Sequence, residues 1–148
     1  MGEETKIVAR IEKNSREQVW IGLNQWKDQW YLFLRTYIPS LEEPDTWIPT
    51  KKGVSLAISA YPLLREAIET LGQDLLTEHE AAVISKSKTQ EVRLGINQYK
   101  GMALISIRTF MEIEGEKRPT QKGVSLKTEF YPQLKEGIHA LGEAIQDL

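Results

Sequence analysis

The sequence predicts an α+β protein built from two ββββα units. This prediction depends on an internal repeat, on strand-like alternation in each copy, and on an amphipathic helix pattern that closes each copy. The chain has 148 residues, 41% of them hydrophobic, and no cysteine. This composition is typical of a globular fold and excludes a disulfide framework, a cysteine-based metal site and a cysteine nucleophile.

The internal repeat consists of two matched blocks. Residues 19–37 and 92–110 share seven of 19 positions, and residues 49–72 and 119–142 share 14 of 24. The offset between the copies falls from 73 to 70 because the first copy has three extra residues near 41–47. Identity of this level, kept in order over two blocks, indicates a tandem duplication.

The duplication suggests how the chain is organised. We expect the first unit at residues 1–76 and the second at 77–148, with the joint near 73–82, where the sequence turns polar. A unit of this size buries little surface on its own. We therefore expect the two units to pack against each other within the chain, as the subunits of a homodimer would.

Each unit begins with strand patterns. Apolar residues alternate with others over 19–24 and over 31–37, which is typical of half-buried strands, and the second copy repeats both patterns. Short turns are expected at 26–29 and 99–102. Two more strands are expected in each copy. An earlier strand is expected at Ile7 to Ile11 in the first copy and at Val83 to Ser85 in the second, and a fourth strand at Val54 to Leu56 and at Val124 to Leu126.

A helix is expected to follow the strands. Leu64, Ile68 and Leu71 lie at i, i+4 and i+7, and the second copy repeats this spacing,. Each unit is then ββββα. We expect the helix to cover one sheet face and to leave the opposite face open.

The helix ends carry recognisable signals. Ser59 and Thr128 are candidate N-caps, and a proline follows each of them in the first turn,. Gly72 is expected to end the first helix as a C′ residue. The second helix is expected to continue past Gly142, because the apolar pattern extends through 144–145.

Charge separates the strand segments from the rest of the chain. Residues 6–37 and 83–110 hold 11 basic and four acidic residues, whereas the remainder holds eight basic and 17 acidic residues. A local basic face can steer a polyanion although the net charge is −2,. The expected open face also carries the aromatic residues Trp20, Tyr31, Phe33 and Tyr37. Trp26 and Tyr99 stand at the turns beside it. Because exposed rings stack on unpaired bases, this face favours single-stranded nucleic acid.

The same residues also have a structural interpretation. Aromatic residues on strands often serve cross-strand packing, and Arg35 and Arg108 could pair with acids in the sheet. The aromatic–lysine pairs at the two turns favour binding more clearly, because a turn apex has little core to fill.

Several motifs recur at matching positions of both copies. The second copy has Tyr99-Lys100-Gly101, Ile105-Ser106-Ile107-Arg108, Pro119, Lys122-Gly123-Val124-Ser125-Leu126, Tyr131 and Leu134-Lys135-Glu136. The first copy has Trp26-Lys27, Leu34-Arg35, Pro49, Lys51-Lys52-Gly53-Val54-Ser55-Leu56, Tyr61 and Leu64-Arg65-Glu66. In these motifs the chain resembles, twice over, the PC4 family, also called transcriptional coactivator p15. The resemblance implies a dimer-like assembly with the helices at the interface, curved exposed sheets and single-stranded DNA binding.

The resemblance also implies roles for individual residues. Trp26 and Tyr99 would stack on bases, and lysines and arginines would contact phosphates or polar base atoms. Tyr61 and Tyr131 stand where the family usually has a tryptophan that contacts DNA. The expected nucleic-acid-binding residues are Trp26, Lys27, Arg35, Lys52, Tyr61, Arg93, Tyr99, Lys100, Arg108, Lys122 and Tyr131.

The chain departs from the family pattern at several positions. Asp28 replaces the turn glycine in the first copy, and an acid there weakens phosphate binding. The open strand faces differ as well, because Trp20 and Phe33 correspond to Arg93 and Ser106 in the second copy. We therefore expect asymmetric binding, and weaker affinity than that of a strongly basic homologue.

Nothing in the sequence favours an enzyme. His79 and His139 do not recur between the copies, and no phosphate-binding loop, HExxH or GxSxG motif is present,. We expect no catalytic residue, no metal and no cofactor. RNA binding on the same face and a protein-interaction module that has lost DNA binding remain open. Expected partners are single-stranded DNA, with RNA as the alternative, and the transcription machinery. The chain is expected to be monomeric and located in a bacterial cytoplasm or nucleoid, or in a eukaryotic nucleus.

Overall fold

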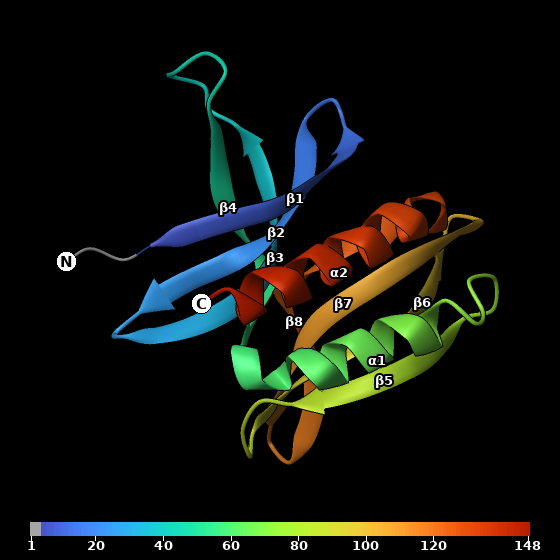
Figure 1. Ribbon diagram of the computed structural model, residues 1–148. Coiled ribbons are helices and arrows are strands. Elements are labelled where there is room, and N and C mark those ends of the chain that lie inside the picture. The colour runs from blue at the N-terminus through green and yellow to red at the C-terminus, as the bar shows by residue number, and fades with distance from the viewer. Residues whose placement is uncertain (1–3) are drawn as a thin grey trace.

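The computed structural model describes residues 4–148 and contains two four-stranded antiparallel sheets, each followed by a helix (Figure 1). Neighbouring strands in each sheet are consecutive in the chain, so both sheets are simple meanders. The first unit consists of β1 (Thr5–Asn14), β2 (Glu17–Trp26), β3 (Gln29–Pro39), β4 (Trp47–Ala57) and α1 (Tyr61–Leu71). The second consists of β5 (His79–Ser85), β6 (Gln90–Tyr99), β7 (Met102–Ile113), β8 (Glu116–Lys127) and α2 (Tyr131–Gln146).

The predicted fold class is confirmed. All the predicted strands form, but the first and fourth strand of each unit extend beyond the short apolar cores that the sequence marks. The reason is that backbone pairing resumes beyond the apolar core, as where Pro49, Ile48 and Trp47 of β4 pair with β3 after an irregularity at residues 50–52. The unit boundary at residues 76 and 77 stays a prediction, and residues 1–3 of the first unit lie outside the described part of the chain.

The core lies between the sheets and the helices. Strand residues of one parity are fully buried, such as Val19, Ile21 and Leu23 in β2, and they join the buried residues of both helices in one cluster. A single continuous core explains why two units of this size are stable on one chain, because each completes the hydrophobic core of the other. The two sheets also meet directly along β4 and β8.

The helices are exchanged between the units. Helix α2 packs on β1 and β2 of the first sheet, and α1 packs on β5 and β6 of the second. A Cβ atom added to Gly137 of α2 would lie 2.7 Å from Ile21 Cδ1 and 3.1 Å from Ala9 Cβ, so α2 approaches the first sheet closely. The expected covered face therefore exists, but the helix that covers it comes from the other unit.

Two tyrosines join the helices reciprocally. The Tyr61 hydroxyl donates a hydrogen bond to Ile138 O at 2.7 Å, and the Tyr131 hydroxyl donates to Ile68 O at 2.7 Å. Burial raises the pKa of both hydroxyl groups, so they remain neutral donors at physiological pH. The helices thus form the interface of an intramolecular pseudo-dimer, as predicted.

The helix ends differ from the prediction. Ser59 and Thr128 lie in short 3₁₀ turns before the helices, and neither caps a helix with its side chain. Gly72 has φ −67°, so it is not a left-handed C′ residue. Gly72 is instead required for space, because a Cβ atom there would collide with the Tyr131 hydroxyl. Gly142 meets Tyr61 in the same way inside α2, which continues to Gln146 as expected.

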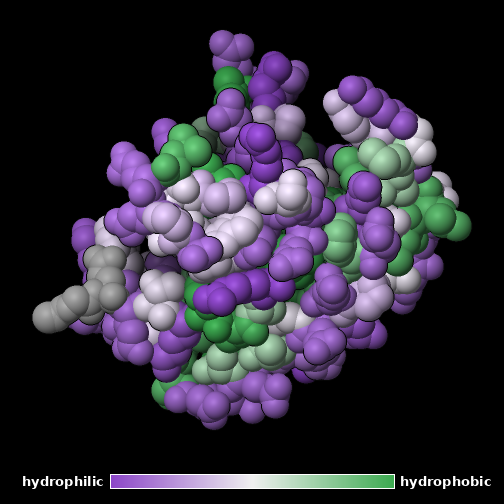
Figure 2. All heavy atoms as spheres, turned by 90° about the horizontal axis from the view of Figure 1, so that it is seen from above, coloured by the Kyte–Doolittle hydropathy of each residue, from purple (hydrophilic) through white to green (hydrophobic). Residues whose placement is uncertain are grey.

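Hydrophilic side chains dominate the surface seen from above, and hydrophobic ones form separate patches (Figure 2). Within the part of the chain that the structure describes, no helix is long and apolar enough to cross a membrane.

Candidate nucleic-acid interface

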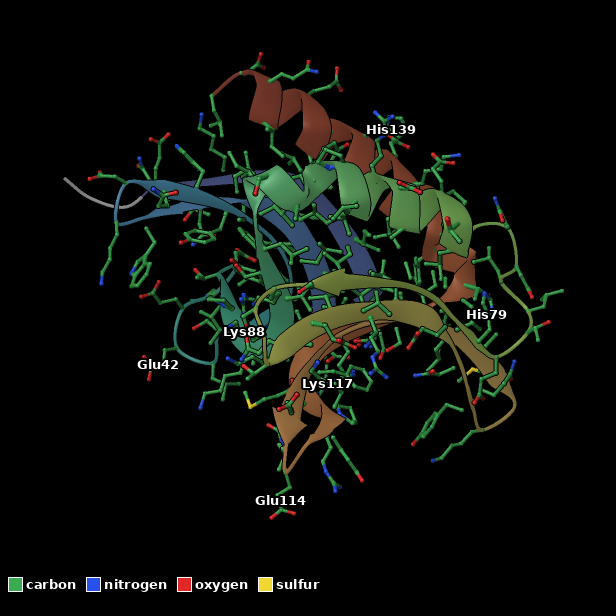
Figure 3. All side chains as sticks on the ribbon, turned by 90° about the horizontal axis from the view of Figure 1, so that it is seen from below. Glu42, His79, Lys88, Glu114, Lys117 and His139 are labelled. Carbon is green, nitrogen blue, oxygen red and sulfur yellow. The ribbon has the colours of Figure 1, made fainter. Side chains whose placement is uncertain are left out.

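Each sheet has a face that points away from the helices, and we call these the first and second outer faces. The first outer face is built from Trp20, Phe33, Arg35 and Tyr37, and the second from the corresponding Arg93, Ser106, Arg108 and Phe110. Lys117 and Glu114 lie on this side of the second sheet, opposite the helix layer that carries His139 (Figure 3).

Two hairpin tips extend the outer faces. The β2–β3 tip carries Trp26 beside Lys27, and the β6–β7 tip carries Tyr99 beside Lys100. Trp26 is 47% exposed and Tyr99 is 56% exposed, so both rings are available for stacking. The Lys27 amine lies 4.5 Å from the Trp26 ring centroid, and the Lys100 amine lies 5.4 Å from that of Tyr99. Each tip therefore offers a flat ring and a cation together, as single-stranded nucleic acid requires.

The backbone explains this placement of the lysines. Lys27 and Lys100 have φ values of 51° and 50°, and the next residues, Asp28 and Gly101, also have positive φ. Two consecutive left-handed residues form the two-residue hairpin turn that matches strand twist. Glycine adopts this conformation readily at 101, whereas Asp28 does so under mild strain.

An arginine crosses a glycine on each outer face. A Cβ atom at Gly123 would lie 2.9 Å from both Cβ and Cζ of Arg108, so the arginine side chain lies directly over the glycine. Arg108 Nη1 donates to Thr120 O at 2.8 Å, which fixes the guanidinium against the sheet. The first outer face repeats this arrangement with Arg35, Gly53 and Thr50. This packing explains why both KGVSL motifs have a glycine, because a larger residue at Gly53 or Gly123 would collide with the arginine side chain.

The first outer face is filled by its own aromatic side chains. Trp20 and Tyr37 stack with ring centroids 3.8 Å apart and an interplanar angle of 13°. Arg10 lies over the Trp20 ring at 4.3 Å. Phe33 is only 5% exposed and reaches across Gly22, and Tyr37 is 9% exposed. Phe33 and Tyr37 are therefore packed rather than displayed, contrary to the expectation of an open aromatic face.

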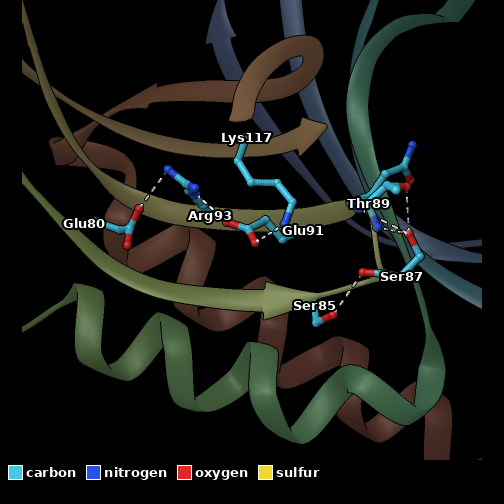
Figure 4. A network of polar contacts seen from close by, with 8 residues as sticks. Glu80, Ser85, Ser87, Thr89, Glu91, Arg93 and Lys117 are labelled. Carbon is cyan, nitrogen blue, oxygen red and sulfur yellow. Dashed lines mark hydrogen bonds and ion pairs between the residues drawn. The ribbon is translucent and has the colours of Figure 1, made fainter. Parts of the chain in front are cut away.

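The second outer face carries an ion-pair network in place of this stack (Figure 4). Arg93 donates to Glu91 at 2.6 Å and lies 3.5 Å from Glu80, while Lys117 donates to Glu91 at 3.3 Å. The hydrogen bond from Arg93, together with Lys117, lowers the pKa of Glu91. Arg93 also lies 4.1 Å from the Phe110 ring. Arg93 is thus on the predicted face, but two carboxylates already neutralise it.

Lys52 and Lys122 lie in matching irregular stretches of β4 and β8, where the pairing with the neighbouring strand shifts register. Burial raises the pKa of Glu17, but the hydrogen bond from Asn14 and the nearby cations Lys13 and Lys52 lower it overall, so Lys52 lies near Glu17. Partial burial of the Lys86 amine, with Lys122 nearby, lowers the pKa of Lys86.

Tyr61 and Tyr131 lie away from the outer faces. Their hydroxyl groups are used in the helix interface, which accounts for both residues without any nucleic acid. On each half the structure thus keeps a tip aromatic beside a tip lysine, and it places the arginine over glycine farther along the same sheet, opposite a residue six positions from the tip aromatic. These six residues are Trp26, Lys27, Arg35, Tyr99, Lys100 and Arg108.

The sequence interpretation missed three contributors. Arg10 reaches the first outer face because it pairs with Trp20 across β1 and β2, and Glu80 and Lys117 reach the second from β5 and β8. Only the strand register reveals these neighbours, and the repeat does not, because Arg10 corresponds to Val83. Among the described residues, no group of three or more histidine, aspartate or glutamate side chains could hold a metal ion.

Comparison with known proteins finds one family and several individual proteins that resemble parts of this chain. The family described as Transcriptional Coactivator p15 (PC4) matches residues 86–137, which include the second tip, Arg108 and the helix start. This part of the chain resembles the PC4 family. The match lies in the second repeat, where the turn keeps its glycine.

Individual relatives match parts of the chain. The RNA polymerase II transcriptional coactivator KELP of Arabidopsis thaliana is 34% identical over 56 residues, which is 38% of this chain. The match spans about a third (34%) of the length of this relative. A crystal structure of a PC4 homologue from Burkholderia pseudomallei is 26% identical with a TM-score of 0.40, and covers 43% of this chain and 86% of its own. A guide-RNA-binding protein complex is 11% identical with a TM-score of 0.40, and covers 93% of this chain and 86% of its own.

Proposed function

We propose that this protein is a PC4-like protein that binds single-stranded DNA without strong sequence preference and acts in transcription regulation, or in DNA replication or repair. The observation that carries the proposal is the repeated tip, in which an exposed ring stands beside a lysine at both ends of the pseudo-dimer. The match of residues 86–137 to the PC4 family and the similarity to a transcriptional coactivator support a role of this kind.

The chemistry favours a single strand over a duplex. A ring at a hairpin tip gains about 1–3 kcal/mol from stacking on an unpaired base, but a duplex hides the faces of its bases. Arg35 and Arg108 stand on the outer faces, and among residues 4–148 no carboxylate forms an ion pair with Arg108. Arg108 is therefore free to bind a phosphate with the donors that Thr120 does not use.

Fluorescence anisotropy tests the proposal. An end-labelled strand of about 20 bases, long enough to cross several stacking positions, is titrated with the protein at low and at high salt. We expect binding that weakens as salt rises, because cations that contact phosphates release counterions. Unlabelled duplex DNA should compete poorly.

Three other outcomes would contradict the proposal. Equal competition by duplex DNA would mean that the tips do not read unpaired bases. Stronger competition by the matching RNA strand would reassign the site to RNA. No binding even at low salt would mean that the fold has lost its nucleic-acid site and serves protein partners.

A further inference from the structure

A hollow on the second outer face distinguishes it from the first. It has a volume of about 410 Å³ and lies over β6 and β7, with Arg93, Asn97, Ser106 and Arg108 in its lining. Phe110, Glu78 and Glu80 are also among the residues that line it. A volume of this order fits a small organic ligand rather than a single ion.

The hollow exists because the middle row of the second sheet has small side chains. Ser106 stands where the first sheet has Phe33, whose ring lies 3.0 Å from the position of a Gly22 Cβ atom. Serine lacks the ring that fills this space. The two repeats have equivalent cross-strand rows at this level. The row in the first sheet is Gly22, Phe33 and Ser55, and the row in the second is Gly95, Ser106 and Ser125.

The lining has two chemically different sides. Arg108 supplies guanidinium donors on one side, with one of its nitrogens held by Thr120. On the other side, Glu80 offers carboxylate oxygens that can only accept hydrogen bonds. The Glu80 side chain is 51% exposed and its contact with Arg93 is 3.5 Å, so it retains acceptor capacity. Asn97 and Ser106 add groups that can both donate and accept.

We propose that this hollow holds one nucleotide of the bound strand, with its base inside and its phosphate toward Arg108. The base is one that carries an exocyclic amino group, as cytosine, adenine and guanine do, because the Glu80 carboxylate accepts hydrogen bonds from that group. Thymine offers Glu80 only its ring N3–H, which stands between two carbonyl oxygens that repel a carboxylate. The first outer face offers no equivalent position, since Phe33 occupies it. The inference rests on the single-strand binding proposed above and adds a nucleotide-selective position to one half of it.

Chemical-shift mapping with deoxycytidine monophosphate tests the inference. In the wild-type protein we expect the amide signals of Gly95 and Ser106 to shift, and those of Gly22 and Phe33 to stay in place. Thymidine monophosphate should need at least about threefold higher concentration for the same shift, which is the effect of losing a weak hydrogen bond. Equal shifts with both nucleotides, or equal shifts on both sheets, would overturn the inference.

Two substitutions at one position provide the structural control. Ser106→Phe places in the second sheet the side chain that fills the first, and it should abolish the shifts at Gly95. Ser106→Thr adds one methyl group, keeps the hydroxyl, and should retain them. Unchanged shifts in a folded Ser106→Phe protein, with folding checked by its thermal melt, would overturn the inference.

The same samples separate this inference from the function on which it depends. A wild-type protein that binds the single-stranded oligonucleotide but shows no mononucleotide shifts would overturn the inference alone. A protein that binds neither probe would overturn both.

Discussion

The two outer faces began as copies of one sequence but now differ in how their centres are filled. The first stacks Arg10, Trp20 and Tyr37 and buries Phe33, so its surface is closed by hydrophobic packing. The second replaces the stack with an ion-pair network and is hollow over Ser106. What both halves keep is the exposed tip and the arginine over glycine. If the protein binds a single strand as proposed, these retained features are the candidates for a binding site shared by both halves, and the centres of the sheets are where the halves differ.

The largest effect should come from removing both tips. Trp26→Ala combined with Tyr99→Ala deletes the two exposed rings, and stacking is worth about 1–3 kcal/mol per base. We expect single-strand affinity to fall by more than about tenfold, since 1.4 kcal/mol corresponds to a factor of ten. Anisotropy measures the loss. Trp20→Ala serves as the control, because it removes a packed ring and should lower stability more than affinity.

The glycines under the arginines should give the next largest effect. Gly123→Ala places a methyl group 2.9 Å from Arg108 Cζ, so the guanidinium must move. We expect a stability loss of about 1–3 kcal/mol, as for other overpacked sites, and weaker binding. Gly53→Ala should cost similar stability in denaturant melts but less affinity. Equal losses of affinity would show that the two halves contribute equally.

The turn residue of the first tip should have a smaller effect of opposite sign. Asp28 has φ 63° and adds a negative charge beside Lys27. Asp28→Gly removes both the backbone strain and the charge, so we expect stability to rise by up to about 1 kcal/mol and affinity to rise a few-fold. Gly101→Asp is the reciprocal variant and should weaken the second tip. Unchanged single-strand affinity in both variants would show that the charge at this turn position does not cause the difference in binding between the two halves.

The smallest effect should be a pH dependence of the ion-pair network. The pKa of Glu91 is lowered in the folded state by the Arg93 hydrogen bond and by Lys117. The stability that ionised Glu91 adds to the folded protein is therefore fully present above the unfolded-state pKa of about 4.3. It is lost as the pH falls through the lower pKa of the folded state. Glu91→Gln should remove about 0.5–1 kcal/mol of stability at neutral pH and flatten the acid limb of a melting-temperature profile. A profile parallel to that of the wild type would contradict this assignment.

The sequence predicts the fold well because its main signals are local. Alternation marks Val19, Ile21 and Leu23 as buried, and helical spacing marks Leu64 and Ile68, in agreement with the structure. The exchange of helices between units is a long-range feature. A buried stripe on α2 has the same pattern whichever sheet it covers, so no local signal distinguishes the two arrangements.

The candidate site was only partly predictable for the same reason. Aromatic–lysine pairs at turns are visible in the sequence, and both tips form as expected. The shared motifs also point to Tyr61 and Tyr131, whose hydroxyl groups are used in the helix interface, and to Lys52 and Lys122, which lie near Glu17 and Lys86. The neutralisation of Arg93 depends on Glu80 from β5, which only the strand register brings near.

The most direct test of single-strand stacking at the tips is tryptophan fluorescence of the wild-type protein and of Trp26→Phe during titration with a single strand. We predict quenching in the wild type that is largely lost in Trp26→Phe, because Trp26 is exposed whereas Trp20, Trp30 and Trp47 are half-buried and should contribute less. Anisotropy of the same samples should show that Trp26→Phe still binds through the second tip. Equal quenching in both proteins, or equal quenching by single-stranded and duplex DNA, would contradict the central claim.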